Sequence, residues 1–504
     1  MIRSILIGAE MLNWSDLHPV DARPSAAGPA AAALFAAALQ PSDSVLLAGP
    51  HSLDLIADVA ARVASVDVLV RSAPDAEEIA AIIERPLADN KVFCGALDRF
   101  TPAYGNSSGY DAVVALDGLG RLVSPDTSKL SWADALAALQ DRLASSGRLL
   151  LGADNQFGFE RLLQPAITAA LPRDEDWGRD LTDAAPVGLK PLRAALDEAG
   201  LDIAETYAVF PSLDDAEVAL TDVSGPLPAA VAARTMADRY AGPALMDPYR
   251  FVQDTVRAGL SVELAPAWYV VTAADDLPGV LPADAVPGGS GVLLEEYLIA
   301  ALRVDDQAAV RRVVPDYVKW LRAQHQDSAK IAAPDNVIFD GMSFRLFSES
   351  GIGVLPVDEL EGEDGEPVPA RGDALVVAHL ARFVRRSMEA GSRQPWSAGG
   401  YPDGLTARLA SMAGITVTKW LSPPNEIVRP LGSAEQLETV ARLSEELAFT
   451  SARAYLFHGQ IVGIRQSKPY RVGHTVTGPL RVIRRHAKRT VRRVQRLPRK
   501  LRGR

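Results

Sequence analysis

Short apolar runs alternate with helical patterns along the first half of the chain. Five of these runs indicate buried strands, over residues 44–48, 66–70, 91–94, 110–116 and 147–152. The segments between several of them carry apolar residues at helical spacing, as in 52–64, 74–83 and 132–144. Strands that are apolar throughout and separated by helices are typical of a parallel sheet covered on both faces. The pattern therefore predicts an α/β domain.

Two further apolar runs complete the predicted sheet. They cover residues 201–210 and 267–272, and a mostly helical insertion over 211–265 separates them. Because the last run follows another strand without room for a simple crossover, we expect it to be antiparallel. The prediction is a Rossmann-like, seven-stranded, mostly parallel sheet over residues 25–275.

The second half of the chain has a different pattern. Residues 276–291 are rich in Pro, Gly and Asp, which predicts a linker. Helical patterns and a hairpin signal over 336–347 follow, so we expect a mainly helical α+β domain over 292–466. Residues 1–24 form an N-terminal segment and residues 467–504 a basic C-terminal tail.

Composition narrows the class of protein. A chain of 504 residues with 48% apolar and 23% charged residues is not disordered throughout. The single cysteine, Cys94, cannot form an intramolecular disulfide, and the histidines lack metal-ligand spacing, so we expect no metal site. The N-terminus lacks the layout of a signal peptide, and the longest apolar stretch is shorter than the ~20 residues of a bilayer span. We therefore expect a cytoplasmic protein.

The net charge of −11 is unevenly distributed. Residues 479–504 contain twelve Lys and Arg and no Asp or Glu, so the rest of the chain is strongly acidic. Apolar residues recur in the tail at helical spacing, at Leu480, Ile483, Ala487, Val491 and Val494. A basic amphipathic helix of this kind suits an anionic membrane surface, which predicts peripheral docking on the inner membrane face. A solvated tail is the alternative, and nucleic-acid binding is not expected because nothing else in the chain, such as a groove of aromatic and basic residues, supports it.

The loop after the first predicted strand is the first place to look for a ligand, because doubly wound sheets bind ligands at the carboxyl ends of their strands. Its sequence, GPHSLD over residues 49–54, contains neither a dinucleotide-binding fingerprint nor a P-loop. The negative charge of Asp54 in the first helical turn would repel a phosphate, but it is compatible with a cationic or zwitterionic ligand.

The order of motifs resembles the class I S-adenosylmethionine-dependent methyltransferases, which carry such motifs on a seven-stranded sheet. YDAVV over residues 110–114 resembles the family's YDxVV, and GRLLL over 147–151 resembles its GGRLLL. NQFG over 155–158 is similar to the N-x-x-G of methyltransferases that act on sugars and cell-envelope glycans. The resemblance implies S-adenosylmethionine as the cofactor.

The resemblance also implies roles for single residues. Arg71 stands where the family carries a carboxylate for the ribose hydroxyls. Histidine is tuned for proton removal near neutral pH, so His51 is the first candidate for a catalytic base and Asp117 the second. The expected cofactor-binding residues are Gly49, His51, Arg71, Asp98 and Asp117, and the expected substrate-binding residues are Asp154, Asn155 and Trp177.

The C-terminal half carries two further resemblances. PDNVIFDG over residues 334–341 resembles a segment in the C-terminal regions of large glycan-modifying methyltransferases. SKPYRVG over 467–473, followed by PLR, resembles the ending of bacterial glycosyltransferases and envelope-glycan enzymes. Together they imply O-methylation of a small-molecule sugar or glycan precursor at the cytoplasmic membrane face.

Two alternatives remain open from the sequence. The chain can be a catalytically inactive binding or scaffold protein of envelope-glycan assembly that keeps the methyltransferase fold. Arg71 can instead hold a phosphorylated nucleotide such as NADP, as arginine does for a 2′-phosphate.

Overall fold

The computed structural model of the chain describes most of its residues, namely 4–19, 23–84, 89–127, 130–163, 185–239, 245–274, 276–349, 357, 359–361, 367–389, 402–417 and 433–469. The chain divides into two compact units, Met1–Glu435 and Gln436–Arg504. Trp177 and the predicted amphipathic tail helix lie outside the described residues. Each unit is described by itself.

The first unit is built on one large sheet with the strand order β1-β4-β3-β2-β5-β6-β9-β7-β8-β10. All seven predicted strands are present, as β2 (Ser44–Ala48), β3 (Ser65–Val70), β4 (Lys91–Gly95), β5 (Tyr110–Ala115), β6 (Leu143–Asp154), β7 (Ile203–Pro211) and β9 (Ala267–Thr272). Neighbouring strands are parallel from β1 to β6. β9 is antiparallel to both β6 and β7, as predicted.

The predicted count of seven strands is wrong, because three short strands extend the sheet. They are β1 (Ile5–Gly8), β8 (Ala216–Leu220) and β10 (Val280–Leu281). β1 pairs with β4 at one edge, while β8 pairs with β7 and β10 with β8 at the other. β8 therefore lies inside the insertion predicted to be mostly helical, and β10 lies inside the predicted linker.

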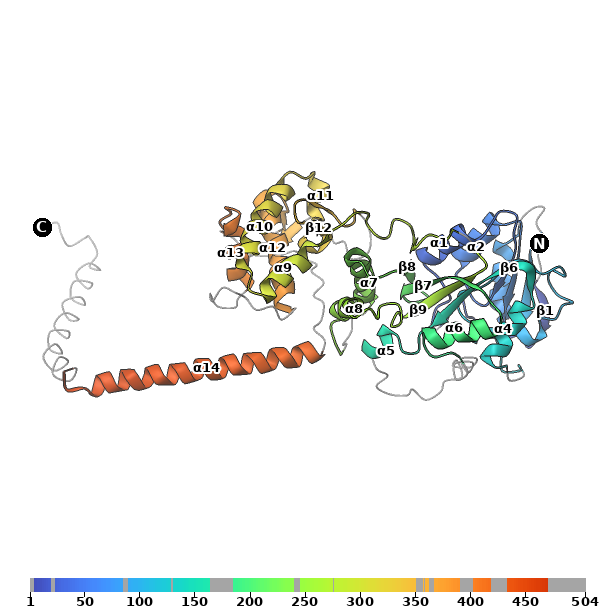
Figure 1. Cartoon of the computed structure of the whole chain (residues 1–504), viewed down its shortest axis with the longest axis horizontal. Helices are drawn as coiled ribbons and strands as arrows, with labels where there is room; N and C mark the ends of the chain where they lie inside the picture. The colour runs from blue at the N-terminus through green and yellow to red at the C-terminus, as the bar shows by residue number, and fades with distance from the viewer. Residues whose placement is uncertain are drawn as a thin grey trace, which may run out of the picture. The chain divides into compact units, whose positions relative to one another are not determined.

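Helices cover both faces of the sheet, because successive strand residues point to opposite sides. Val45 and Leu47 of β2 pack into one core, whereas Leu46 and Ala48 pack into the other. The first core includes α1 (Pro29–Ala38), α2 (Leu53–Arg62) and α3 (Ala73–Ile82), as Figure 1 shows for α1 and α2. The second includes α4 (Trp132–Gln140), α5 (Phe159–Leu163), α6 (Leu189–Glu198), α7 (Pro226–Arg239) and α8 (Pro248–Arg257).

A helical layer with its own core follows the sheet in the first unit. It contains α9 (Leu294–Arg303), α10 (Gln307–Arg322), α11 (Gln326–Lys330), α12 (Gly372–Glu389) and α13 (Pro402–Met412). β11 (Val292–Leu293), β12 (Val337–Phe339) and β13 (Phe344–Leu346) form a small sheet, and β14 (Glu359–Glu361) pairs with β15 (Pro367–Pro369). β12 and β13 pair antiparallel where the sequence predicts a hairpin.

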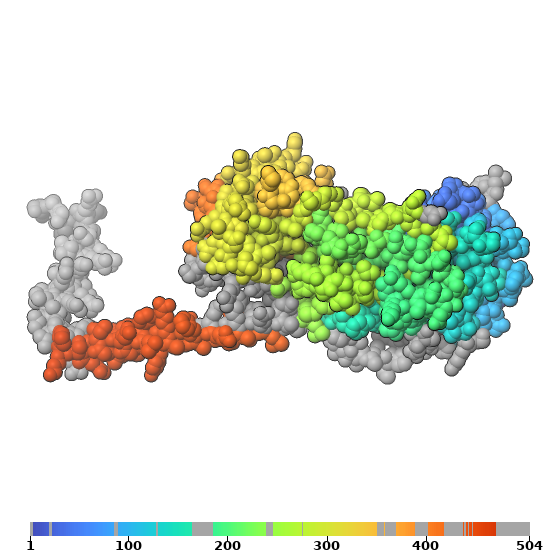
Figure 2. Space-filling view, in the orientation of Figure 1, coloured from blue at the N-terminus to red at the C-terminus, as the bar shows by residue number. Residues whose placement is uncertain are grey.

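Buried charges join the sheet domain to this layer through the segment 334–336. Arg234 of α7 donates to the carbonyl of Asp335, and the Asp335 carboxylate accepts from Arg382 at 2.6 Å. Arg386 lies 3.6 Å from the same carboxylate and 2.7 Å from Glu295 of α9. These residues form the interlayer cluster, and Figure 2 shows the green and yellow regions adjoining on the visible face.

The second unit contains most of the long helix α14 (Ser433–Gln466), labelled in Figure 1. The helix begins three residues before the predicted helix over 436–466 and ends at the same residue. Among the described helices of the whole chain, none combines the length and the apolar composition that a membrane span requires.

Candidate functional site

The carboxyl edge of the sheet is crossed by the N-terminal strap, defined here as residues 11–19 and 23–27. The strap first bonds at the end of β3, where Met11 N–H donates to the Arg71 carbonyl at 2.7 Å and Ala73 N–H donates to the Met11 carbonyl at 3.0 Å. It then reaches the loop after β2, where Ser52 N–H donates to the Ala26 carbonyl at 2.9 Å. The strap therefore lies where a doubly wound sheet binds its ligand.

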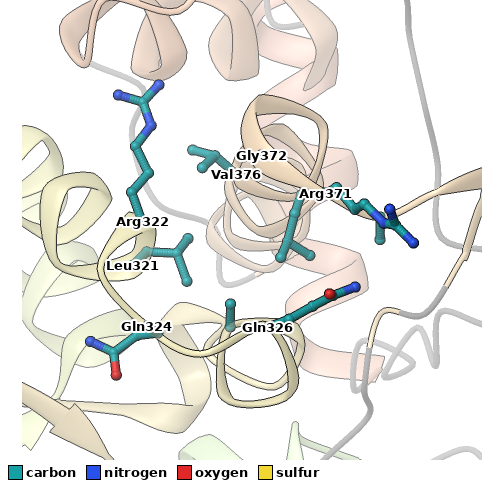
Figure 3. A pocket seen from close by; sticks show the side chains of 10 residues that line it. Leu321, Arg322, Gln324, Gln326, Arg371, Gly372 and Val376 are labelled. Carbon is teal, nitrogen blue, oxygen red and sulfur yellow. The ribbon is translucent and has the colours of Figure 1, made fainter.

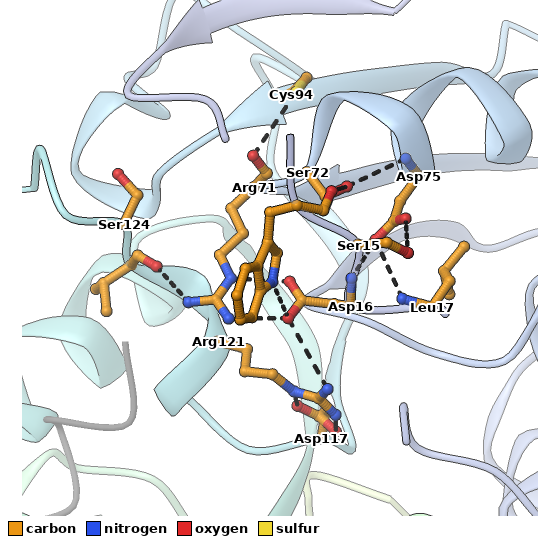
Figure 4. A network of polar contacts seen from close by, with 12 residues as sticks. Ser15, Asp16, Leu17, Arg71, Ser72, Asp75, Cys94, Asp117, Arg121 and Ser124 are labelled. Carbon is orange, nitrogen blue, oxygen red and sulfur yellow. Dashed lines mark hydrogen bonds and ion pairs between the residues drawn. The ribbon is translucent and has the colours of Figure 1, made fainter. Parts of the chain in front are cut away.

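Arg71 is held by the strap and by the segment that follows β5. Its Nε and Nη2 each donate to the Asp16 carboxylate at 2.8 Å, and Nη1 donates to the Val123 carbonyl at 2.8 Å (Figure 4). Both charged side chains are buried, with 2% of Arg71 and 5% of Asp16 exposed. Burial alone would raise the pKa of Asp16, but the hydrogen bonds and charge of Arg71 hold that pKa below its ordinary value. The pair has the bidentate geometry of strong ion pairs.

Asp117 at the end of β5 is the centre of a second set of ion pairs. Its fully buried carboxylate accepts from Arg23 of the strap at 2.9 Å and from Arg121 Nε at 2.7 Å. Arg23 also contacts Asp154 at the end of β6, at 3.1 Å. The structure thus brings Asp117 and Asp154 together through one guanidinium.

The two sets are continuous, because Arg121 also lies 3.9 Å from Asp16. The resulting edge ion-pair chain alternates in charge across the ends of β3, β5 and β6. Its members are Arg71, Asp16, Arg121, Asp117, Arg23 and Asp154. Three of them are the predicted site residues Arg71, Asp117 and Asp154, and each is bonded to another protein side chain.

His51 is buried in the loop after β2, with both ring nitrogens engaged. Nδ1 lies 3.0 Å from the Gly49 carbonyl, and Leu116 N–H donates to Nε2 at 3.2 Å. This pairing assigns the neutral tautomer with the proton on Nδ1. Burial lowers the pKa of His51 below its ordinary value. To act as a base, the ring would first have to release the Leu116 amide, so the predicted catalytic role stays a prediction.

Gly49 and Asn155 have clear local structural roles. Gly49 has φ +89°, a region that favours glycine, and a Cβ there would lie 3.4 Å from Leu122 Cδ2. Asn155 is buried, and its amide nitrogen donates to the carbonyls of Glu263 and Ala265 at 2.9 and 2.8 Å. It therefore ties the end of β6 to the segment that leads into β9.

Asp98 follows β4 in the short helix Leu97–Arg99, where it pairs with Arg99 at 3.6 Å.

A cavity of about 280 Å³ lies in the helical layer, lined by residues such as Leu321, Arg322 and Val376 (Figure 3). None of the predicted site residues lines it. Among the described residues, no group of three or more His, Cys, Asp or Glu could hold a metal ion.

Sequence reasoning missed the partners of the predicted site residues, namely Asp16, Arg23 and Arg121. One signal could have pointed to them. A cationic Arg71 at the end of an apolar strand needs a carboxylate partner if it is buried. The N-terminal segment offers one in its sequence WSD over residues 14–16.

The strand order β4-β3-β2-β5-β6 is that of a doubly wound α/β domain, with its switch point between β2 and β5. Neither a protein-family model nor a curated protein matches the chain. The chain is similar to several solved structures of methyltransferases, each over part of its length.

Three examples show the level of similarity. A protein from Bacillus halodurans C-125 that is described as a putative methyltransferase shares 16% identity over 35% of this chain and 70% of its own, with a TM-score of 0.25. The protein complexed with the Trm112 methyltransferase activator of Haloferax volcanii, also described as a putative methyltransferase, shares 13% identity over 49% of this chain and 89% of its own, with a TM-score of 0.31. A Thiobacillus denitrificans enzyme bound to S-adenosyl-L-homocysteine shares 14% over 51% and 94%, with a TM-score of 0.26. At such TM-scores these similarities do not assign an activity.

Proposed function

We propose that the sheet domain is an S-adenosylmethionine-dependent methyltransferase that O-methylates a sugar or glycan precursor. The observation that carries this proposal is the strand order β4-β3-β2-β5-β6-β9-β7 with β9 antiparallel. It agrees with the fold that the sequence resemblance implies, and it places Gly49, Arg71 and Asp117 at the ends of neighbouring strands. A ligand at the switch point would meet these residues.

The residues at this edge do not fit the cofactor as they are arranged here. A ribose needs hydrogen-bonding groups, but Arg71 is bound to Asp16 and Val123, and Asp117 to Arg23 and Arg121. The strap would have to release Arg71 before a ligand could contact that guanidinium.

This arrangement favours a second candidate function, that of a non-catalytic binding or scaffold protein of envelope-glycan assembly. In that case, the strap permanently replaces a ligand at the edge. The two candidates differ in a single property, which is whether the Asp16–Arg71 pair opens to admit a nucleoside.

Calorimetric titration of the full chain and of Asp16→Asn separates the candidates. We expect S-adenosylmethionine and S-adenosylhomocysteine to bind, and to bind at least about tenfold more tightly to Asp16→Asn, because weakening the strap removes its competition. Asp254→Asn is the matched control, since it changes an exposed Asp–Arg pair on α8. Absence of binding to all three folded proteins would favour the scaffold function, and binding of NADP alone would favour a phosphorylated nucleotide.

The basic tail supports a location for this activity. Twelve cationic residues over 479–504 would attract the chain to anionic lipid at the inner membrane face, at roughly 1 kcal/mol for each residue near the surface. Binding to anionic vesicles should weaken as salt rises. Vesicle binding that survives removal of residues 479–504 would contradict this part of the proposal.

A further inference from the structure

Helix α14 carries a row of exposed side chains that are mostly apolar. Leu443, Leu447 and Phe457 are 54%, 68% and 51% exposed, and Ile461 and Ile464 are 48% and 60% exposed. Helices in water are stabilised mainly by packing of an apolar face, so an exposed row of this length indicates a surface that another element covers.

The row has the spacing of a coiled-coil seam. Its positions recur at steps of 3, 4, 3, 4, 3, 4 and 3 residues, at Val440, Leu443, Leu447, Thr450, Ala454, Phe457, Ile461 and Ile464. These eight positions, the α14 seam, hold no charged residue, and only Thr450 is polar. The seam covers about 36 Å of helix.

The repeat of 3.5 residues indicates what kind of element covers the seam. A straight α-helix drifts by about 20° per heptad relative to this repeat, so the seam winds around the helix with a left-handed path. A second helix with the same repeat follows that path by supercoiling, whereas a flat lipid surface does not. A second copy of α14 carries the same repeat and therefore matches this path.

We propose that the chain forms a homodimer in which the α14 seams of two copies pack as a left-handed coiled coil. Knobs from each seam would enter holes on the other helix. The two small residues, Thr450 and Ala454, lie at the middle of the seam and would allow the helices to approach closely there. The proposal does not depend on the function proposed for the sheet domain.

The test is the mass of the full chain in solution, measured by sedimentation velocity over a range of concentrations. We expect a species of twice 53.7 kDa for the wild type. The double variant Leu447→Lys with Ile461→Lys places two charges in the seam and should sediment as a monomer. The conservative pair Leu447→Met with Ile461→Leu should remain dimeric, because it keeps the apolar repeat.

A matched control tests whether self-association depends on the seam itself or on any exposed apolar residue of α14. Phe449 and Leu456 also lie on α14, are 70% and 68% exposed, and fall outside the seam. The variant Phe449→Lys with Leu456→Lys removes as many apolar side chains and adds the same charge, and it should remain dimeric. Thermal unfolding by circular dichroism checks that the first unit stays folded in every variant.

Two results would overturn the proposal. One is a wild-type chain that is monomeric at every concentration. The other is an equal loss of self-association in both lysine variants, since the contact would then not follow the heptad. Binding of a monomeric wild type to neutral phosphatidylcholine vesicles, lost equally in both variants, would assign the apolar surface to lipid instead.

Discussion

The edge ion-pair chain and the interlayer cluster are both networks of acidic side chains paired with arginines, yet they differ in what surrounds them. In the interlayer cluster, the Asp335, Arg382, Arg386 and Glu295 side chains are at most 15% exposed. In the edge chain, exposure rises from 2% at Arg71 to 28% at Arg23 and 50% at Asp154. One end of the edge chain is therefore buried, and the other end is exposed to solvent.

The backbone around the two networks differs as well. The interlayer cluster connects four elements with large apolar cores on both sides, namely α7, α9, α12 and the segment 334–336. The edge chain is completed by the N-terminal strap, and we expect this strap to detach without unfolding the sheet. Both a structural network and a ligand site can therefore contain ion pairs. The free energy needed to separate the paired groups distinguishes the two better than the presence of the pairs.

The largest expected effect follows from breaking the interlayer cluster. Asp335→Ala leaves Arg382 and Arg386 buried without this carboxylate, so we expect a loss of about 3–5 kcal/mol in the free energy of unfolding. Urea denaturation measures it. Asp373→Ala is the control, because its pair with Arg322 is exposed and should contribute less than about 1 kcal/mol. Equal losses in the two variants would remove the distinction between buried and exposed pairs.

Breaking the edge chain should have a smaller effect on stability. In Asp16→Asn the strap can detach and allow water to reach Arg71, so we expect a loss of about 2 kcal/mol, below the cost of an ion left fully buried. Hydrogen exchange sharpens the comparison. The amides of Met11 and Ala73 should exchange at least about tenfold faster, while those of β5 remain protected. Unchanged exchange at Met11 would show that the strap does not open.

Much of the sheet could be predicted because its central strands are apolar on both faces. The strands that sequence analysis missed are short and lie toward the edges. β1 leaves Leu6 56% exposed, and β10 has two residues in a Pro- and Gly-rich segment. β8 is as long as the predicted β2 and β4, but it lies beside the edge strand β10 and within a segment that is otherwise mostly helical. Such strands are specified by their pairing with a neighbour more than by their own pattern.

The candidate site was predictable to the same degree. The topology rule points to Asp117 and Asp154, because strand ends on one edge can be read from the sequence, and the family resemblance points to Arg71. Their partners could not be assigned in this way, since Asp16 lies 55 residues from Arg71 and Arg23 lies 131 from Asp154. A single sequence does not show which distant carboxylate neutralises a buried arginine.

The smallest expected effect concerns the buried histidine of each region, His51 at the edge and His379 in the helical layer. Burial lowers the pKa of His379 from 6.5 to about 4. Burial also lowers the pKa of His51 below its ordinary value. The unfolded chain therefore binds more protons below pH 6.5, so stability is complete above that pH and falls as the pH decreases toward 4.

For His379 this linkage amounts to about 1 kcal/mol of lost stability between pH 7 and pH 5.5. His379→Gln should remove that part of the slope in urea denaturation, because glutamine does not titrate. Its amide can still donate to the Ala329 carbonyl, which His379 Nε2 contacts at 2.9 Å. His325→Gln is the control, since His325 is exposed at the start of α11 and the slope should stay as in the wild type. A slope unchanged in His379→Gln would mean that the pKa of this ring is not lowered in the folded protein, so that its burial does not contribute to the pH dependence of stability.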